Sequence, residues 1–230
     1  MAKATGGPPA LPDDRAYTAN YCEENIYLLA QSFSNENAVR EQWDIYVVFI
    51  SNETKTVALW RHKYDDSVVV WDYHVILILK PKVEAPVSND DAGGSEVPVV
   101  RSDVEVERIV WVYDFDSQLG MPCQWEAYIA QTFLPDDKVP EQYRCMFRVV
   151  PAATYLERFA SDRSHMLRPC PNGSPESQYA SAPPNYPNLC GAKAKVAGIL
   201  NNLMSSFVTM VVGPETFGDV FRLDQFIGWG

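Results

Sequence analysis

The stretch Val68-Val69-Val70-Trp71-Asp72-Tyr73-His74-Val75-Ile76-Leu77-Ile78-Leu79 is rich in β-branched and aromatic residues, which predicts a β-strand. Alternation along this strand would place the polar Asp72 and His74 on the same face as Val70, Ile76 and Ile78. Polar side chains on an apolar face need partners, so His74 is either a buried histidine satisfied by the backbone or a functional group. Among the three histidines of the chain, only His74 has this strand context, and it is our candidate general base.

Further elements can be placed around this strand. The apolar runs 45–50, 56–60 and 109–113 predict neighbouring strands. Apolar residues at the i, i+3, i+4 and i+7 spacing of a helix follow Cys22, and they are Ile26, Leu29, Ala30 and Phe33. Helices are also expected near 123–133 and 152–160, and a short strand followed by a helical turn within 218–230. The chain is therefore predicted to have an α/β fold.

Length and composition set the expected domain boundaries. A chain of 230 residues is most often one domain, and we expect a single catalytic domain over 17–230. Residues 1–16 are rich in Gly and Pro, which predicts a disordered tail. The segment 84–103 combines Pro, Gly and acidic residues, so we expect a surface insertion between two paired strands. The proline-rich segment 167–190 is expected to be a second, irregular surface loop.

Charge and cysteine usage exclude several classes of protein. The formal net charge of −11 disfavours nucleic acid or an anionic membrane as partner and favours a cationic ligand such as a peptide amino terminus. The apolar runs are too short for a membrane span, and the start of the chain lacks the apolar core of a secretory signal, so we expect an intracellular protein. The five cysteines form no Cys-x-x-Cys pair, which argues for free thiols rather than disulfides or a zinc knuckle.

The position of Cys22 before a helical pattern suggests a nucleophile. A helix amino terminus and a nearby imidazolium both lower the pKa of a thiol. Asp114 follows the strand 109–113 directly, where a carboxylate can hold the imidazole of His74. Alternatively, Cys22 is a small buried apolar residue, and Asp116, two residues after Asp114, starts a turn. A Cys, His and Asp in this order are by themselves a weak signal of a thiol hydrolase.

Five motifs together carry a much more specific signal. They are Tyr21-Cys22-Glu23-Glu24-Asn25-Ile26, Val48-Phe49-Ile50-Ser51-Asn52-Glu53, Val70-Trp71-Asp72-Tyr73-His74-Val75, Tyr113-Asp114-Phe115-Asp116 and Phe159-Ala160-Ser161-Asp162-Arg163-Ser164-His165-Met166. In this order, from about Tyr17 to the end of the chain, the sequence closely resembles the protein N-terminal glutamine amidohydrolase family. The segments 84–103 and 167–190 look longer than in the animal members.

The resemblance implies a fold, a triad and a reaction. The implied fold is a three-layer α-β-α sandwich with a mainly antiparallel sheet, similar to papain and transglutaminase cores. By motif, Cys22 is the nucleophile, His74 the base and Asp114 the third member, with no metal and no cofactor. The implied reaction converts an N-terminal glutamine to glutamate and ammonia upstream of arginylation in the N-degron pathway. Arginyltransferase-pathway partners, a monomeric state and a location in the cytoplasm and nucleus are expected on the same basis.

Substrate recognition requires further residues. Selectivity for a terminal glutamine needs an acceptor for its α-ammonium, and the candidate acids are Glu23, Glu24, Asp72 and Asp116, each with a structural role as the alternative. Ser51 and Asn52 are candidates for hydrogen bonds to the substrate backbone, and the Cys22 amide is the expected first oxyanion donor. Two rival functions use the same residues: a transglutaminase-like or peptidase activity, and a non-catalytic module that binds amino termini.

Overall fold

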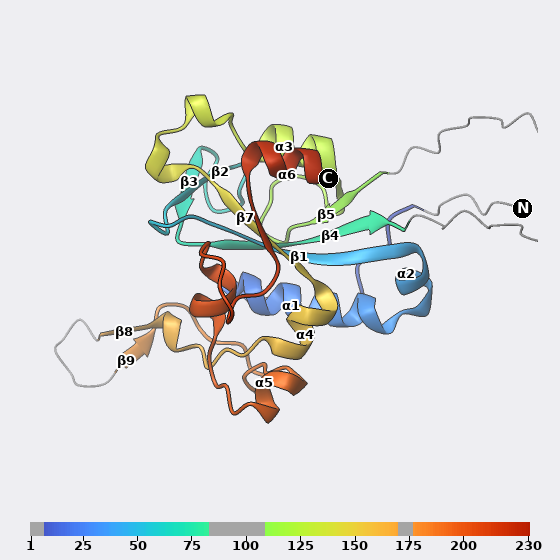
Figure 1. Ribbon diagram of the computed structural model, residues 1–230, viewed down its shortest axis with the longest axis vertical. Coiled ribbons are helices and arrows are strands. Elements are labelled where there is room, and N and C mark those ends of the chain that lie inside the picture. Colours follow the sequence, from blue (N-terminus) through green and yellow to red (C-terminus); the bar gives the residue numbers. More distant parts are fainter. Residues whose placement is uncertain (1–6, 83–108, 170–176) are drawn as a thin grey trace, which may run out of the picture.

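A six-stranded sheet forms the centre of the computed structural model, which describes residues 7–82, 109–169 and 177–230 (Figure 1). The strand order is β10-β7-β1-β4-β5-β6, and every described pairing is antiparallel. The strands are β1 (Trp43–Ser51), β4 (His74–Pro81), β5 (Trp111–Tyr113), β6 (Cys123–Gln124), β7 (Met146–Pro151) and β10 (Asp219–Arg222). The predicted α/β fold with a mainly antiparallel sheet is confirmed.

Helices and two small sheets complete the described fold. The small sheets pair β2 (Val57–Trp60) with β3 (Val68–Trp71), and β8 (Leu167–Pro169) with β9 (Ser177–Tyr179). The α-helices are α1 (Cys22–Asn35), α2 (Asn37–Gln42), α3 (Trp125–Thr132), α4 (Ala152–Arg158), α5 (Ala192–Val196) and α6 (Leu223–Trp229). Shorter helical turns are η1 (Asp136–Lys138), η2 (Glu141–Tyr143), η3 (Ser164–Met166) and the π-helical η4 (Leu203–Val208). Within the described ranges, no helix is long and apolar enough to cross a membrane.

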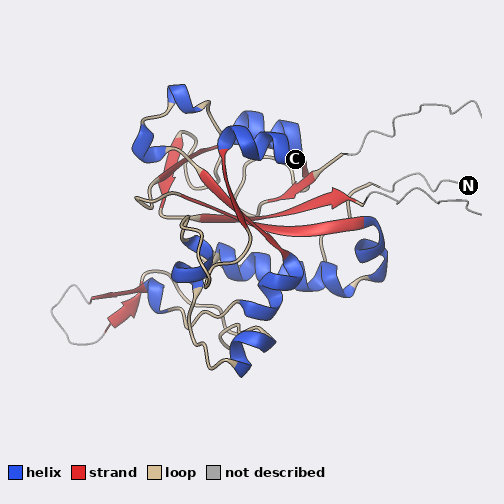
Figure 2. Cartoon of the chain, in the orientation of Figure 1, coloured by secondary structure: helices blue, strands red, loops and turns tan. Residues whose placement is uncertain are grey.

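The two central strands are buried on both faces, which explains their nearly continuous apolar sequences. Val47 and Phe49 of β1 pack in one apolar cluster with α1, whose buried stripe includes the predicted Ile26 and Phe33. Val48 and Ile50 face the opposite cluster, which contains residues of α3 and α6. Figures 1 and 2 accordingly show α1 and α4 on one side of the sheet and α3 and α6 on the other.

One predicted element differs from the structure. The stretch 68–79 is not one strand but two, because β3 ends at Trp71 and β4 begins at His74, and they belong to different sheets. At the break, Asp72 accepts the Tyr73 amide proton on Oδ1 at 3.0 Å, and its carbonyl accepts the Ser51 hydroxyl proton at 2.6 Å. These two hydrogen bonds take the place of the strand-to-strand hydrogen bonds that a continuous strand would make here. Asp72 therefore does not continue the face of His74, which is the first residue of β4.

The predicted loops and the predicted tail have different outcomes. The predicted insertion 84–103 lies outside the described residues, although β4 and β5 on either side of it pair as expected. Segment 167–190, predicted as irregular, contains the β8–β9 pairing. In the predicted tail, residues 7–16 are described, and there the Pro9 carbonyl accepts a proton from Tyr113 Oη at 2.6 Å and Leu11 packs on the core. The domain boundary at residue 17 stays a prediction.

A buried ion pair ties a distant loop to the start of α1. Arg163 binds both carboxylate oxygens of the fully buried Glu24, through Nε at 2.8 Å and Nη2 at 2.9 Å. Its remaining donors reach the carbonyls of Pro184 and Tyr186 in the proline-rich loop. Arg163 thereby fixes two loops on the first turn of α1, where the predicted nucleophile lies.

Loss of this pair should be costly, because Arg163→Met leaves the Glu24 carboxylate buried without its cation. We expect the free energy of unfolding, measured by urea denaturation, to fall by about 3–5 kcal/mol. In the double variant Glu24→Leu with Arg163→Met, both charges are absent, so the loss should be clearly smaller than the sum of the two single losses. A loss below about 1 kcal/mol in Arg163→Met would contradict the clamping role.

Candidate active site

A cavity of about 490 Å³ lies at the amino end of α1. Three of the predicted site residues line it together with Cys22, namely Asp72, His74 and Asp116. The opposite walls come from the loop after β2, from η3 and from residues 180–181, which follow β9. The described structure thus brings residues from widely separated motifs to one hollow.

Cys22 is the first residue of α1, as predicted. Its Sγ lies 3.8 Å from Oε2 of Glu23, and the Val75 amide of β4 donates to the thiolate form. The pKa of the Cys22 thiol is nevertheless raised, first because the site removes it from water, and then because the carboxylates of Glu23 and Asp116 repel a thiolate. On balance the pKa of Cys22 is therefore raised, so burial and the carboxylates outweigh any lowering by the helix terminus.

His74 and Asp114 form a buried hydrogen-bonded pair. His74 Nε2 lies 2.9 Å from Asp114 Oδ1, and both side chains are about 4% exposed. Because Asp114 engages Nε2, the other ring nitrogen, Nδ1, is left for proton transfer at the cavity. Burial opposes protonation of His74, but the charge and hydrogen bond of Asp114 outweigh it and raise the pKa of His74.

The carboxylate of Asp114 is itself held by three donors. Besides His74, the Tyr128 hydroxyl donates to Oδ2 at 2.8 Å and the Asp116 amide donates to Oδ1 at 2.9 Å. Burial alone would raise the pKa of Asp114, but the nearby His74 and these hydrogen bonds lower it, so the group stays ionised. Asp114 follows β5 directly, where the sequence placed it. Sequence reasoning missed Tyr128, because a tyrosine in a helix carries no signal of its partner.

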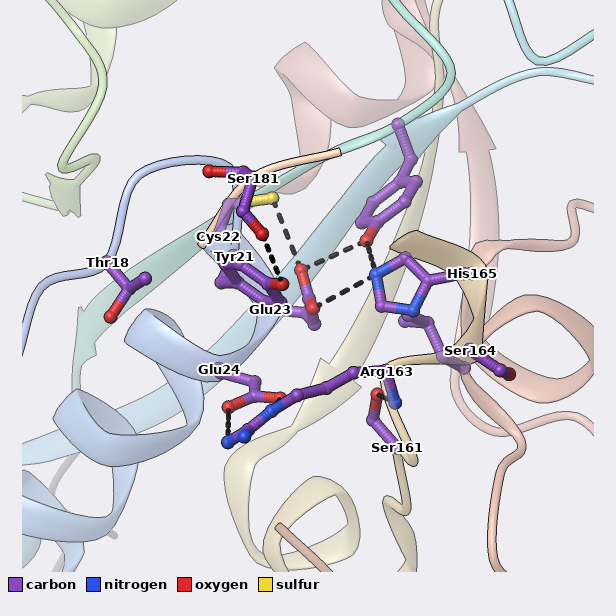
Figure 3. Close-up of polar contacts among 12 residues, drawn as sticks. Thr18, Tyr21, Cys22, Glu23, Glu24, Ser161, Arg163, Ser164, His165 and Ser181 are labelled. Carbon is purple, nitrogen blue, oxygen red and sulfur yellow. Dashed lines mark hydrogen bonds and ion pairs between the residues drawn. The ribbon is translucent and has the colours of Figure 1, made fainter. Parts of the chain in front are cut away.

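Glu23 lies in a cluster of polar side chains between Cys22 and His165 (Figure 3). Its side chain is fully buried and does not line the hollow. Oε2 accepts a proton from Tyr73 Oη at 3.0 Å, while Oε1 lies 3.5 Å from His165 Nε2. The predicted contact of Glu23 with substrate therefore has no support in this geometry. His165, which the sequence motif offered without a role, lines the cavity and contacts this cluster.

The remaining residues of the Cys22 motif are structural in their contacts. Glu24 is committed to Arg163, as described above. Asn25 exchanges two hydrogen bonds with the backbone of Thr18, one at 2.8 Å and one at 2.9 Å, and so anchors the loop that leads into α1. Glu24 was a candidate for binding the substrate's ammonium, but both of its carboxylate oxygens are bound by Arg163.

Ser51 and Asn52 do not reach the Cys22 cavity. The Ser51 hydroxyl donates to the Asp72 carbonyl, and the side-chain amide of Asn52 donates to the carbonyls of Thr56, Gln142 and Arg144. Asn52 instead lines a second hollow, beside η2. The structure assigns both side chains to the positioning of loops, and their predicted hydrogen bonds to substrate find no support here.

Asp72 and Asp116 are the predicted acids that do line the cavity. Asp72 is exposed and accepts only the Tyr73 amide proton among the described contacts of its side chain. Asp116 is half-buried, and its Oδ1 accepts a proton from Tyr17 Oη at 2.6 Å. Both remain candidates for binding a positively charged part of a substrate.

One cluster at the cavity contains potential metal ligands. Within the part of the chain that is described, His62, His74 and Asp116 each offer a ligand atom, and these atoms lie within 4.8 Å of one another. Of these, His74 is engaged by Asp114 and Asp116 by Tyr17. Burial, followed by the neighbouring His74, lowers the pKa of His62. The sequence-based expectation of no metal stays a prediction.

This arrangement contains the groups that thiol-hydrolase chemistry requires. A protonated thiol faces a cavity shared with an imidazole whose pKa is raised by a buried aspartate. Such a base can accept the proton of the thiol as the thiol attacks a carbonyl carbon.

Comparison with known proteins agrees with this chemistry. The sequence model of the N-terminal glutamine amidase family matches residues 17–229. The protein N-terminal glutamine amidohydrolase of Bos taurus is 32% identical over 99% of this chain and 93% of its own length. Proteins of the same name from Drosophila grimshawi and Drosophila melanogaster are each 31% identical over 93% of this chain and 87% of their own lengths. The predicted resemblance is confirmed: this chain is a hydrolase of amide C–N bonds and belongs to the N-terminal glutamine amidase family.

Proposed function

We propose that this protein hydrolyses the side-chain carboxamide of a glutamine at the amino terminus of proteins and peptides, releasing ammonia and leaving glutamate. Membership of the family supports the reaction. The observation that carries the mechanism is the buried His74–Asp114 pair at a cavity that also holds Cys22. These three side chains supply a nucleophile, a base and a group that orients the base.

The proposed first half-reaction begins from a neutral thiol. Because the pKa of Cys22 is raised, His74 removes the thiol proton as Sγ attacks the carboxamide carbon. The backbone amides at the start of α1, beginning with that of Cys22, face the developing oxyanion. The tetrahedral intermediate then collapses, His74 gives its proton to the departing nitrogen, and ammonia leaves a γ-glutamyl thioester on Cys22.

The second half-reaction restores the thiol. Water enters where ammonia has left, His74 removes one of its protons, and the hydroxide attacks the thioester carbon. Collapse of the second intermediate breaks the C–S bond, and His74 returns a proton to sulfur. Asp114 keeps Nε2 of the imidazole engaged in both halves, so that the same ring nitrogen serves each proton transfer.

We further propose that the fold is a three-layer α-β-α sandwich of the papain and transglutaminase type, formed by one domain over 17–230. Three features support this: the nucleophile begins a helix, the base begins a strand, and the acid follows the adjacent strand. Helices lie on both faces of the sheet, in agreement with three layers (Figure 2).

The biological setting is proposed on the family resemblance. An amino-terminal glutamate is a substrate for arginylation, so this reaction would feed the N-degron pathway, with arginyltransferase-pathway proteins as partners. We expect a monomer in the cytoplasm and nucleus, without nucleic-acid or membrane partners. The net charge of −11 supports the preference for a positively charged peptide terminus over polyanions.

The rival functions differ in their products. A transglutaminase-like enzyme would transfer the thioester to an amine, a peptidase would cut the backbone, and a binding module would give no product. Three matched short peptides distinguish them, one beginning with Gln, one with Asn and one with acetylated Gln. We expect ammonia release from the free Gln peptide alone. Crosslinking, backbone cleavage or no reaction at all would contradict the proposed deamidation.

Replacement of the nucleophile provides the matched control. Cys22→Ala should abolish ammonia release while leaving the free energy of unfolding, measured in urea, within about 1 kcal/mol of the original, because alanine is well tolerated in a helix. Cys123→Ala, which removes another partly exposed thiol, should retain activity. A normal rate in Cys22→Ala would remove this residue from the mechanism.

The role of Asp114 predicts a change in pH dependence. Asp114 raises the pKa of His74, so Asp114→Asn should lower that pKa and move the acid limb of kcat/KM to lower pH. The plateau should fall by about 100-fold or more, because the imidazole loses its orienting carboxylate. Tyr128→Phe removes one hydrogen bond to the same group and should cost less. An unshifted acid limb in Asp114→Asn would contradict the assignment of the base.

The neighbouring carboxylate predicts the reactivity of the thiol. Glu23 raises the pKa of Cys22, so Glu23→Gln should lower it, and iodoacetamide should alkylate Cys22 at lower pH than in the unmodified protein. Mass spectrometry of the fragment containing Cys22 follows this reaction separately from the other thiols. Glu126→Gln, which changes an exposed first-turn glutamate of α3, is the control and should give no shift. An unchanged pH dependence in Glu23→Gln would contradict the electrostatic effect.

A further inference from the structure

The cavity contains one half-buried carboxylate that the proposed triad does not use. Asp116 follows β5 by three residues, and its backbone amide donates to Asp114. Of its two carboxylate oxygens, Oδ1 accepts the proton of Tyr17 Oη at 2.6 Å. Within the described residues, no donor contacts Oδ2, and Asp116 takes part in no ion pair. A half-buried carboxylate with one oxygen committed and one available is a natural acceptor for a cation.

Three basic side chains around the same hollow form no ion pair with Asp116, because one is neutral and the other two donate to backbone carbonyls. Burial and the neighbouring His74 lower the pKa of His62, so this ring is neutral at pH 7. Lys63 Nζ donates to the Phe115 carbonyl at 2.7 Å, and Arg168 Nη1 donates to two carbonyls of its own segment. Within the described structure, the Asp116 carboxylate therefore forms no ion pair, and a substrate could supply the cation.

Asp116 lines the same cavity as the thiol of Cys22. The α-nitrogen and the carboxamide carbon are four bonds apart, which is about 5 Å in the extended conformation. A carboxylate oxygen of Asp116 lies within 4.8 Å of ring nitrogens of both His62 and His74, and its charge is felt at the Cys22 thiol. A glutamine whose carboxamide lies at Sγ would hold its α-ammonium about 5 Å from the reacting carbon, and Asp116 is an acidic group of the same cavity that can receive it.

The other acids fit less well. Glu23 is fully buried behind the cavity, and Glu24 is fully paired with Arg163. Asp72 lines the cavity but is exposed, so pairing with an ammonium there would be screened by water. The aromatic rings of Tyr17 and Trp71 also line the hollow, and such rings add cation–π attraction for an ammonium.

We propose that the Asp116 carboxylate, oriented by the hydroxyl of Tyr17, binds the α-ammonium of the substrate and thereby selects a terminal glutamine. This inference rests on the proposed function. An internal or acylated glutamine brings a neutral amide instead of an ammonium, and its binding would cover the Asp116 carboxylate without supplying a cation. Asp116 is thus a specificity-determining residue, whereas Cys22, His74 and Asp114 carry out the reaction.

Binding measurements test this role apart from turnover. The Cys22→Ala protein is titrated by calorimetry with two peptides. One begins with Gln, and in the other a 4-carbamoylbutanoyl group replaces this glutamine, so that only the α-amino group is missing. We expect the amino peptide to bind about 30-fold more tightly or better. Addition of Asp116→Asn should reduce this preference to about 3-fold or less, with little change for the des-amino peptide. Asparagine keeps the Oδ1 acceptor for Tyr17.

Matched variants separate the outcomes. Asp66→Asn removes a charge near the cavity but outside its lining and keeps the acceptor of the Gln118 bond, so the preference should survive. The inference is overturned if the preference survives Asp116→Asn, if that change weakens both peptides equally, if Asp72→Asn removes the preference instead, or if Cys22→Ala shows no preference. If binding depends on Asp116 but the protein with Cys22 intact releases no ammonia from the Gln peptide, the result would instead contradict the proposed deamidation alone.

Discussion

Two glutamates in the first turn of α1, Glu23 and Glu24, are fully buried, and much of the site depends on how their charges are compensated. Buried carboxylates are costly unless cations or donors meet them. The loop of residues 161–166 supplies both partners, Arg163 for Glu24 and His165 beside Glu23. The helix that begins with Cys22 and a loop more than 130 residues later in the chain are therefore one structural unit (Figure 3).

This compensation has a consequence for the chemistry. Arg163 neutralises Glu24, but Glu23 keeps its influence on the adjacent thiol, and Asp116 adds to it. The thiol is thus held protonated, and in the proposed mechanism His74 acts as a base at the moment of attack. A positively charged substrate entering the same cavity would offset part of this negative field, which couples recognition of the amino terminus to activation of the nucleophile.

The sequence predicted the elements that depend on local pattern. The apolar spacing after Cys22, the run 45–50 and the final segment 218–230 correctly indicated α1, β1, β10 and α6. What failed depends on contacts between distant residues. At the break in the predicted strand, the Asp72 carbonyl accepts the hydroxyl proton of Ser51, and the side chain of Asn52 donates to the distant carbonyl of Gln142.

For the candidate site too, the residues in recognisable motifs were predicted, and those that depend on distant partners were not. Motif resemblance proposed Cys22, His74 and Asp114, and the described geometry brings Cys22 and His74 to one cavity and joins His74 to Asp114 by a hydrogen bond. The positions of Tyr128, Tyr73 and His165 could not be predicted, because each role depends on a partner at least 14 residues away in sequence. The raised pKa of Cys22 was not predicted for the same reason. It depends on burial and on the charges of nearby side chains, which a sequence pattern does not indicate, whereas the pattern does indicate a helix terminus.

The central claim is that the sulfur of Cys22 attacks the side-chain carbon of a terminal glutamine. The most direct test uses a peptide whose terminal glutamine carries a diazoketone in place of the carboxamide, followed by mass spectrometric mapping of the labelled residue. The account predicts one label per chain, on Cys22, with loss of ammonia release and protection by the Gln peptide. Labelling of a different cysteine, or continued ammonia release after full labelling of Cys22, would contradict it.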